Sequence, residues 1–132
     1  MKKYWVLSKN HMLREIKKIR QINGEPSRRW FNSHDMDLII WHDKNEFIGF
    51  QICYEKTGQE KALSWKKDSG QVHQKVDDGE SRKGHYKATP LLVNIGQYNI
   101  EKIKNDFEKY SQSISKEVRC FVQTILAVND PN

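Results

Sequence analysis

The stretch EFIGFQICYEK, residues 46–56, constrains the fold most, because its apolar side chains alternate along the chain. In an extended strand, one face takes every second residue, here Ile48, Phe50, Ile52 and Tyr54. The opposite face takes the other set, which is Phe47, Gly49, Gln51 and Cys53. Aromatic and β-branched segments of similar length precede and follow this stretch, at 28–33, 36–42, 61–67, 71–76 and 86–94. Polar, turn-like residues separate them, and no helical pattern lies between them. This order predicts an antiparallel meander rather than βαβ units.

Helical spacing is found at the two ends of the chain. Residues 10–23 repeat apolar side chains at Met12, Ile16 and Ile19, and Gly24 and Pro26 follow as stop signals. We therefore expect an N-terminal helix there, with Asn10 as its cap. After Gly96, two apolar stripes are separated by SQSIS at 111–115, which predicts two C-terminal helices.

Together these patterns predict an α+β fold. Its antiparallel meander sheet has about five strands, with the N-terminal helix and the two C-terminal helices packed on one face. With 132 residues, the chain is expected to form one domain. We expect a basic N-terminal segment with its helix at 1–27, the sheet at 28–95 and the C-terminal helices at 97–128.

The positive charge is concentrated near the N-terminus. Residues 1–35 hold nine Lys and Arg and three Asp and Glu, so the net charge of +6 comes from this part of the chain. Such a cluster indicates either a surface for nucleic acid or an acidic partner, or simply the solvated face of a helix. The residues that would contact nucleic acid are Arg14, Lys17, Lys18, Arg28 and Arg29.

Three of the four tryptophans, Trp30, Trp41 and Trp65, fall on predicted strands close to Arg or Lys. Aromatic side chains beside basic residues on a sheet can stack on nucleobases. They can equally form the core between the sheet and the helices. The sequence leaves both interpretations open.

A third feature is the acidic run VDDGE at 76–80, which has His73 before it and His85 after it. Its Asp-Gly step is a strong hairpin signal. The alternative is a metal or acid/base site in which His73, Asp77, Asp78, Glu80 and His85 converge, although the spacing matches neither an EF-hand nor a zinc motif. Ser33, His34 and Asp35 are consecutive, whereas a nucleophilic triad is assembled by the fold from distant residues. The chain has no motif for a nucleotide or for another cofactor, and we expect none.

The segments RRWF, DMDLIIW, GFQICYEK, EKALSW, VDDGE and KATPLLV lie between residues 28 and 95. As a set they resemble a family of small uncharacterised bacterial proteins. Gln71 and Val72 stand where the resemblance implies an aromatic and a small residue, whereas His73 fits. The family has no established activity, so the resemblance implies kinship without a mechanism.

We therefore expect a non-enzymatic binding or interaction module with a protein or small-molecule ligand. The residues expected to bind it are Trp41, Gln51, Trp65, His73, Asp77, Asp78 and Glu80. One alternative is nucleic-acid binding through the basic N-terminal segment, and a second is a metal-dependent enzyme at the acidic turn. Two cysteines in apolar contexts predict buried free thiols in a reducing compartment. The N-terminus has too few apolar residues for a signal peptide, and no segment is apolar enough to span a membrane. A cytoplasmic protein without a membrane partner is expected.

Overall fold

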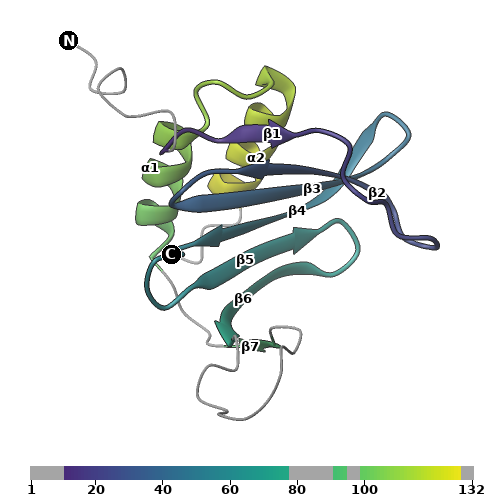
Figure 1. The fold of residues 1–132 in the computed structure, drawn as a ribbon. Helices are drawn as coiled ribbons and strands as arrows, with labels where there is room; N and C mark the ends of the chain where they lie inside the picture. Colours follow the sequence, from purple (N-terminus) through teal and green to yellow (C-terminus); the bar gives the residue numbers. More distant parts are fainter. Residues whose placement is uncertain (1–10, 78–90, 95–98, 129–132) are drawn as a thin grey trace.

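The computed structural model describes residues 11–77, 91–94 and 99–128 (Figure 1). Seven strands form one sheet in which each strand pairs antiparallel with the next one along the chain. The strands are β1 (Arg14–Ile16), β2 (Ser27–Asn32), β3 (Met36–Asp43), β4 (Glu46–Tyr54), β5 (Lys61–Lys66), β6 (Gly70–Asp77) and β7 (Leu91–Asn94). Two helices follow, α1 (Ile100–Tyr110) and α2 (Lys116–Val128). The predicted α+β class and antiparallel meander are confirmed, with two more strands than expected.

Both helices lie behind the sheet in Figure 1, and the core fills the space between the two layers. A row of directly opposed side chains crosses this face of the sheet from β2 to β5. It consists of Phe31, Leu38, Ile52 and Leu63, each at most 1% exposed. The helices bury the stripes expected from their sequence, including Ile103 and Phe107 of α1 and Val118 and Val122 of α2. Asn99 caps α1 by accepting a hydrogen bond from the backbone of Lys102, and Ser111 ends the helix.

Strand β4 departs from strict alternation at one point. Its register with β3 shifts between Trp41 and His42, where Trp41 is opposite Gly49 but His42 is opposite Phe47. This β-bulge leaves Ile48 without a partner in β3, and the alternation of side chains between the two faces is interrupted between Phe47 and Gly49. Phe47 packs against Phe121 of α2 with ring centroids 5.2 Å apart. Ile48 instead lines a surface pocket beside Trp41. The faces predicted for these two residues were therefore wrong.

The predicted N-terminal helix was also wrong for the described residues. Arg14–Ile16 form β1, whose residues pair with Trp30, Phe31 and Asn32 of β2. Lys18 has φ of 58°, a left-handed conformation that does not occur inside a right-handed helix. Isoleucine is β-branched and suits a strand, and a short helix is only marginally stable without tertiary packing, whereas β1 is held by its pairing with β2. Asn10, the expected cap, lies outside the described residues.

Leu13, which is fully buried, ties the beginning of the sheet to the helical layer. Its N–H donates to the carbonyl of Tyr110 at 2.9 Å, and its carbonyl accepts from the hydroxyl of Ser113 at 3.1 Å. Across the residues that the structure describes, neither helix has the length and apolar character needed to cross a membrane.

Candidate binding face

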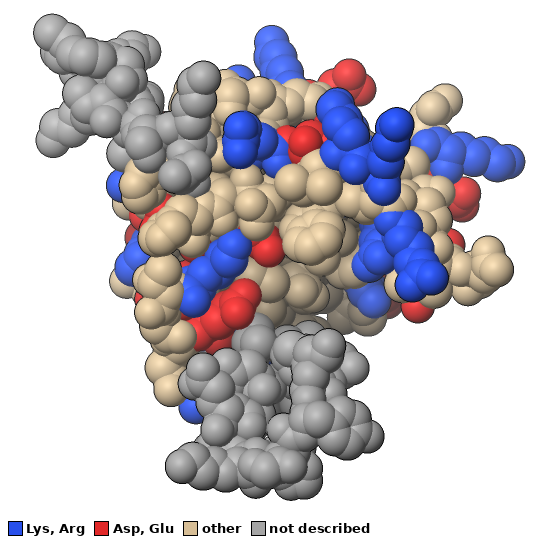
Figure 2. Space-filling view, in the orientation of Figure 1, with Lys and Arg blue, Asp and Glu red and all other residues tan. Residues whose placement is uncertain are grey.

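The side of the sheet opposite the helices, which we call the open face, points toward the viewer in Figures 1 and 2. A row of directly opposed side chains crosses it from β1 to β6: Ile16, Trp30, Ile39, Gln51, Ser64 and Val72. Three of these, Ile16, Trp30 and Val72, are among the most exposed large apolar residues described, and Trp30 is 39% exposed. Ile16 and Trp30 are adjacent in this row, whereas the polar Gln51 and Ser64 separate them from Val72. An exposed apolar pair of this kind can contribute to an interaction surface.

A second row on the open face brings together Arg28, Trp41, Gly49 and Lys66 from β2 to β5. The Lys66 ammonium lies 5.0 Å from the centre of the Trp41 ring, which is a cation–π contact. Gly49 lies beneath both side chains, with the position of an added Cβ only 3.4 Å from the Trp41 ring and 3.3 Å from Lys66 Cγ. Next to this row is a pocket of about 610 Å³, with apolar walls from Trp41, Ile48 and Pro26. Acidic and basic side chains, among them Glu46 and Lys67, form the rest of its lining.

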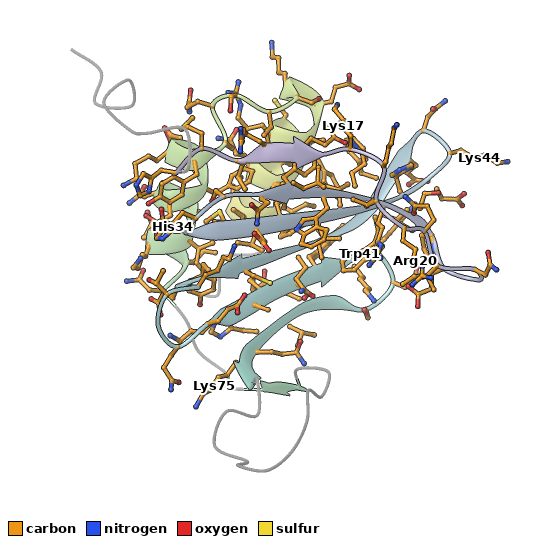
Figure 3. All side chains as sticks on the ribbon, viewed as in Figure 1. Lys17, Arg20, His34, Trp41, Lys44 and Lys75 are labelled. Carbon is orange, nitrogen blue, oxygen red and sulfur yellow. The ribbon has the colours of Figure 1, made fainter. Side chains whose placement is uncertain are left out.

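Basic side chains gather at the same end of the sheet, and we call Lys17, Lys18, Arg20 and Arg28 the basic cluster. Lys17, Lys18 and Arg28 line a pocket of about 350 Å³ between the chain after β1 and the start of β2. The Arg28 guanidinium donates two hydrogen bonds, at 2.9 and 3.2 Å, to the carbonyl of Arg20. Gln21 also exchanges two hydrogen bonds with the Arg28 backbone, so the segment that follows β1 is tied to β2. Figure 3 shows Lys17, Arg20 and Trp41 toward this end, and Figure 2 shows Lys and Arg side chains gathered there.

Arg29, one of the two remaining predicted nucleic-acid contacts, lies on the helix-facing side of β2 and is already paired. Its guanidinium donates two hydrogen bonds of 2.8 Å to the Glu15 carboxylate and lies 5.3 Å from the centre of the Phe31 ring. The hydrogen bond from Arg29 lowers the pKa of Glu15, although partial burial opposes this shift. Arg14 lies on the open face in β1, opposite Asn32. The structure thus brings Lys17, Lys18 and Arg28 together and gives Arg29 a structural partner.

The residues predicted to bind a ligand are divided between the two faces. Trp41 and Gln51 lie on the open face, whereas Trp65 packs against Phe50 and Phe121 on the helix-facing side. His73 is buried on that side as well, where its Nε2 hydrogen-bonds the Tyr54 hydroxyl and the two rings stack. A buried phenol and imidazole that satisfy each other explain this histidine as part of the structure.

The acidic run is described only at its start. Asp77 ends β6 opposite Leu91 of β7, and its side chain is not described. Asp78, Glu80 and His85 lie outside the described residues, as does the expected Asp78-Gly79 turn. The acidic metal or acid/base site stays a prediction.

Cys53 is a half-buried free thiol on the open face, and Cys120 is an exposed one. Burial raises the pKa of the Cys53 thiol to about 11, against a smaller opposing effect of the hydrogen bond from Gln51. The thiol is therefore protonated at neutral pH and unsuited to act as a nucleophile. The prediction that both cysteines are buried was wrong for Cys120, because it lies on the solvent side of α2.

Sequence reasoning missed a cluster at the opposite end of the sheet. His11 Nδ1 lies 2.5 Å from one oxygen of the Asp35 carboxylate, and His34 Nδ1 lies 3.3 Å from the other. Burial alone would raise the pKa of Asp35, but hydrogen bonds from the two imidazoles outweigh it and lower the pKa. The consecutive Ser33, His34 and Asp35 were noticed in the sequence. His11 could not be added to them, because the helix predicted for residues 10–23 gave no reason to bring it to the β2–β3 turn.

No protein-family model matches the chain, and neither a curated protein nor a solved structure shows significant similarity to it.

Proposed function

We propose that the protein is a non-enzymatic binding module that takes a single-stranded nucleic acid on its open face. The observation that carries this proposal is the position of the exposed Trp30 indole between Arg28 and Asn32 along β2, on the open face, which neither described helix covers. Sheets that bind single strands combine an aromatic surface, on which bases stack, with cations that follow the phosphates.

The charge around Trp30 supports the same ligand. Arg14 lies in the neighbouring strand, and the basic cluster begins where that strand ends. Asp37, the carboxylate in β3 beside this region, is paired with the Lys56 ammonium at 2.8 Å and with the Asn32 amide at 2.7 Å. The Lys56 ammonium thereby offsets the charge of this carboxylate, which lowers its repulsion of a phosphate chain beside Trp30.

The first prediction concerns binding of a fluorescently labelled single-stranded RNA or DNA of about 12 nucleotides. Fluorescence anisotropy between about 50 and 200 mM KCl should show an association constant that falls linearly with salt on a double logarithmic scale. Each phosphate contact contributes a slope of about −0.7 for a single strand. Trp30→Ala should weaken binding by about 5- to 150-fold, since stacking of one base on an aromatic side chain contributes about 1–3 kcal/mol. It should leave the salt slope unchanged.

Variants of the cations separate charge from stacking. Lys17→Ala should reduce the salt slope by about 0.7 with a smaller loss of affinity. The matched control is Lys116→Ala, which removes an exposed lysine from α2 in the layer behind the sheet and should change neither quantity. Absence of binding at the lowest salt, or an equal effect of K17A and K116A, would contradict the proposal. If the open face binds a protein instead of a nucleic acid, no binding of the labelled single strand is expected even at the lowest salt.

A further inference from the structure

We propose that His11, His34 and Asp35 form a binding site for a divalent transition-metal ion such as Zn²⁺. The site is independent of the proposed function, because it lies at the other end of the sheet from the basic cluster. Figure 3 shows His34 at that end, away from Trp41 and Arg20. It also differs from the predicted acidic site, with which it shares no residue.

The donor atoms already converge. One ligand atom from each of the three side chains lies within 4.8 Å of the others, with His11 Nδ1 and His34 Nδ1 on the two oxygens of one carboxylate. The imidazole rings are 5.6 Å apart at an angle of 67°, so they meet edge to face around the carboxylate rather than stacking flat. An ion bound here would replace the two hydrogen bonds by bonds from each donor atom to the ion.

The chemistry of the donors selects the class of metal. Two imidazole nitrogens and one carboxylate oxygen suit Zn²⁺, Ni²⁺, Cu²⁺ or Fe²⁺, whereas Ca²⁺ and Mg²⁺ prefer oxygen ligands throughout. Three protein ligands leave at least one coordination position for water. All three residues are at least partly exposed, so an ion can reach them from solvent.

Both parts of the chain that carry the ligands are held firmly. In the β2–β3 turn, the buried Ser33 hydroxyl donates to the carbonyl of Met36 at 2.7 Å and accepts from its N–H at 2.9 Å. The Lys56 ammonium donates to the Ser33 carbonyl at 2.8 Å, which fixes the turn from a third side. On the other side, His11 stands two residues before the fully buried Leu13, whose backbone is bonded to Tyr110 and Ser113. A preformed set of ligands on anchored backbone is the condition for a specific rather than incidental ion site.

A plain hydrogen-bonded group of two histidines and an aspartate has the same distances, and metal titration separates the two. Isothermal titration of the full chain with ZnCl₂ should show one ion bound per molecule. With CoCl₂, visible absorption should show d–d bands of a low-coordinate ion with nitrogen and oxygen ligands. His11→Ala, His34→Ala and Asp35→Asn should each weaken Zn²⁺ binding by more than about tenfold. The thermal stabilisation by Zn²⁺ should disappear in the same variants.

The matched control is His42→Ala, which removes a histidine of β3 that bonds the Lys44 carbonyl near the far end of the sheet. It should bind Zn²⁺ as the unchanged protein does. Circular dichroism of each variant verifies that the fold is retained, since all three ligands lie at the surface. The proposal is overturned if no stoichiometric Zn²⁺ binding is found, or if H42A weakens binding as much as H34A. Loss of binding on Asp78→Asn, with H11A unaffected, would assign the ion to the acidic run instead.

Discussion

Gly49 shows how one residue without a side chain determines the arrangement of the open face. A Cβ at this position would lie 2.8 Å from the carbonyl oxygen of Trp65, on the neighbouring strand. That oxygen belongs to the backbone of the sheet and cannot move aside without disturbing the pairing of β4 and β5. The Trp41 ring and the Lys66 stem also approach the same point, so the cation–π contact between them depends on the absence of a side chain below.

We therefore predict that Gly49→Ala lowers the free energy of unfolding by about 1–3 kcal/mol, the usual cost of overpacking. The gain in strand propensity from replacing glycine is smaller than this. Urea denaturation followed by tryptophan fluorescence measures the difference. Gly58→Ala is the control, because nothing lies within 4 Å of its added Cβ and its backbone is not left-handed. It should be neutral or stabilising by less than about 1 kcal/mol. Equal effects of G49A and G58A would show that the close approach of the Trp65 carbonyl does not exclude a side chain at position 49.

At the scale of elements, the sequence correctly predicted those helices whose apolar residues follow a single periodicity. The stripes of α1 and α2, with Ser111 between them, were read correctly from the sequence because each buries one face against the sheet. Strand β1 was missed, because Ile16 and Ile19 at helical spacing do not reveal a pairing with residues near position 31. The bulge at Ile48 was missed for the same kind of reason, since it arises from the register between two strands.

The pairing of β1 with β2 makes a contribution to stability that depends on pH. Glu15 of β1 and Arg29 of β2 form a bidentate ion pair, and the hydrogen bond from Arg29 holds the folded-state pKa of Glu15 below its usual value of 4.5. A carboxylate with a lowered pKa stabilises the folded state at pH values above its unfolded pKa. This stabilisation is lost as the pH falls through the folded pKa.

We predict that Glu15→Gln costs less than about 1 kcal/mol at pH 7, since the pair is partly exposed to solvent. The difference from the unchanged protein should begin to shrink near pH 4.5 and vanish below the folded pKa. Urea denaturation at a series of pH values measures it. Glu46→Gln removes a carboxylate from a more exposed pair, with Lys67, and should show almost no difference at any of these pH values. A difference for E15Q that is constant with pH, or that grows in acid, would refute this account of β1.

For the whole molecule, the packing of the two layers determines which aromatic residues are available for binding. The sequence placed Trp30, Trp41 and Trp65 on strands but could not tell their faces apart, because the face depends on the register of the complete sheet. The helices cover one face and bury Trp65 against Phe121, and the other two indoles are left on the open face. The division between core and candidate binding surface is therefore a property of the assembled layers.

Phe121 of α2 contacts three aromatic side chains of the sheet. Its ring lies 5.2 Å from that of Phe47, 5.9 Å from that of Trp65 and 6.1 Å from that of Phe50, so it joins the helix to β4 and β5. We predict that Phe121→Ala lowers the free energy of unfolding by about 2–4 kcal/mol, somewhat less than for a fully buried phenylalanine. Loss of that much is a large fraction of the stability of a small domain. Urea denaturation followed by circular dichroism measures it without relying on the tryptophans. Val128→Ala, at a position of α2 that is 75% exposed, should change the stability by less than about 0.5 kcal/mol. If both variants had the same stability, α2 would not be held by this aromatic cluster, and the helix-facing side of the sheet would have to be stabilised by α1 and the remaining apolar contacts.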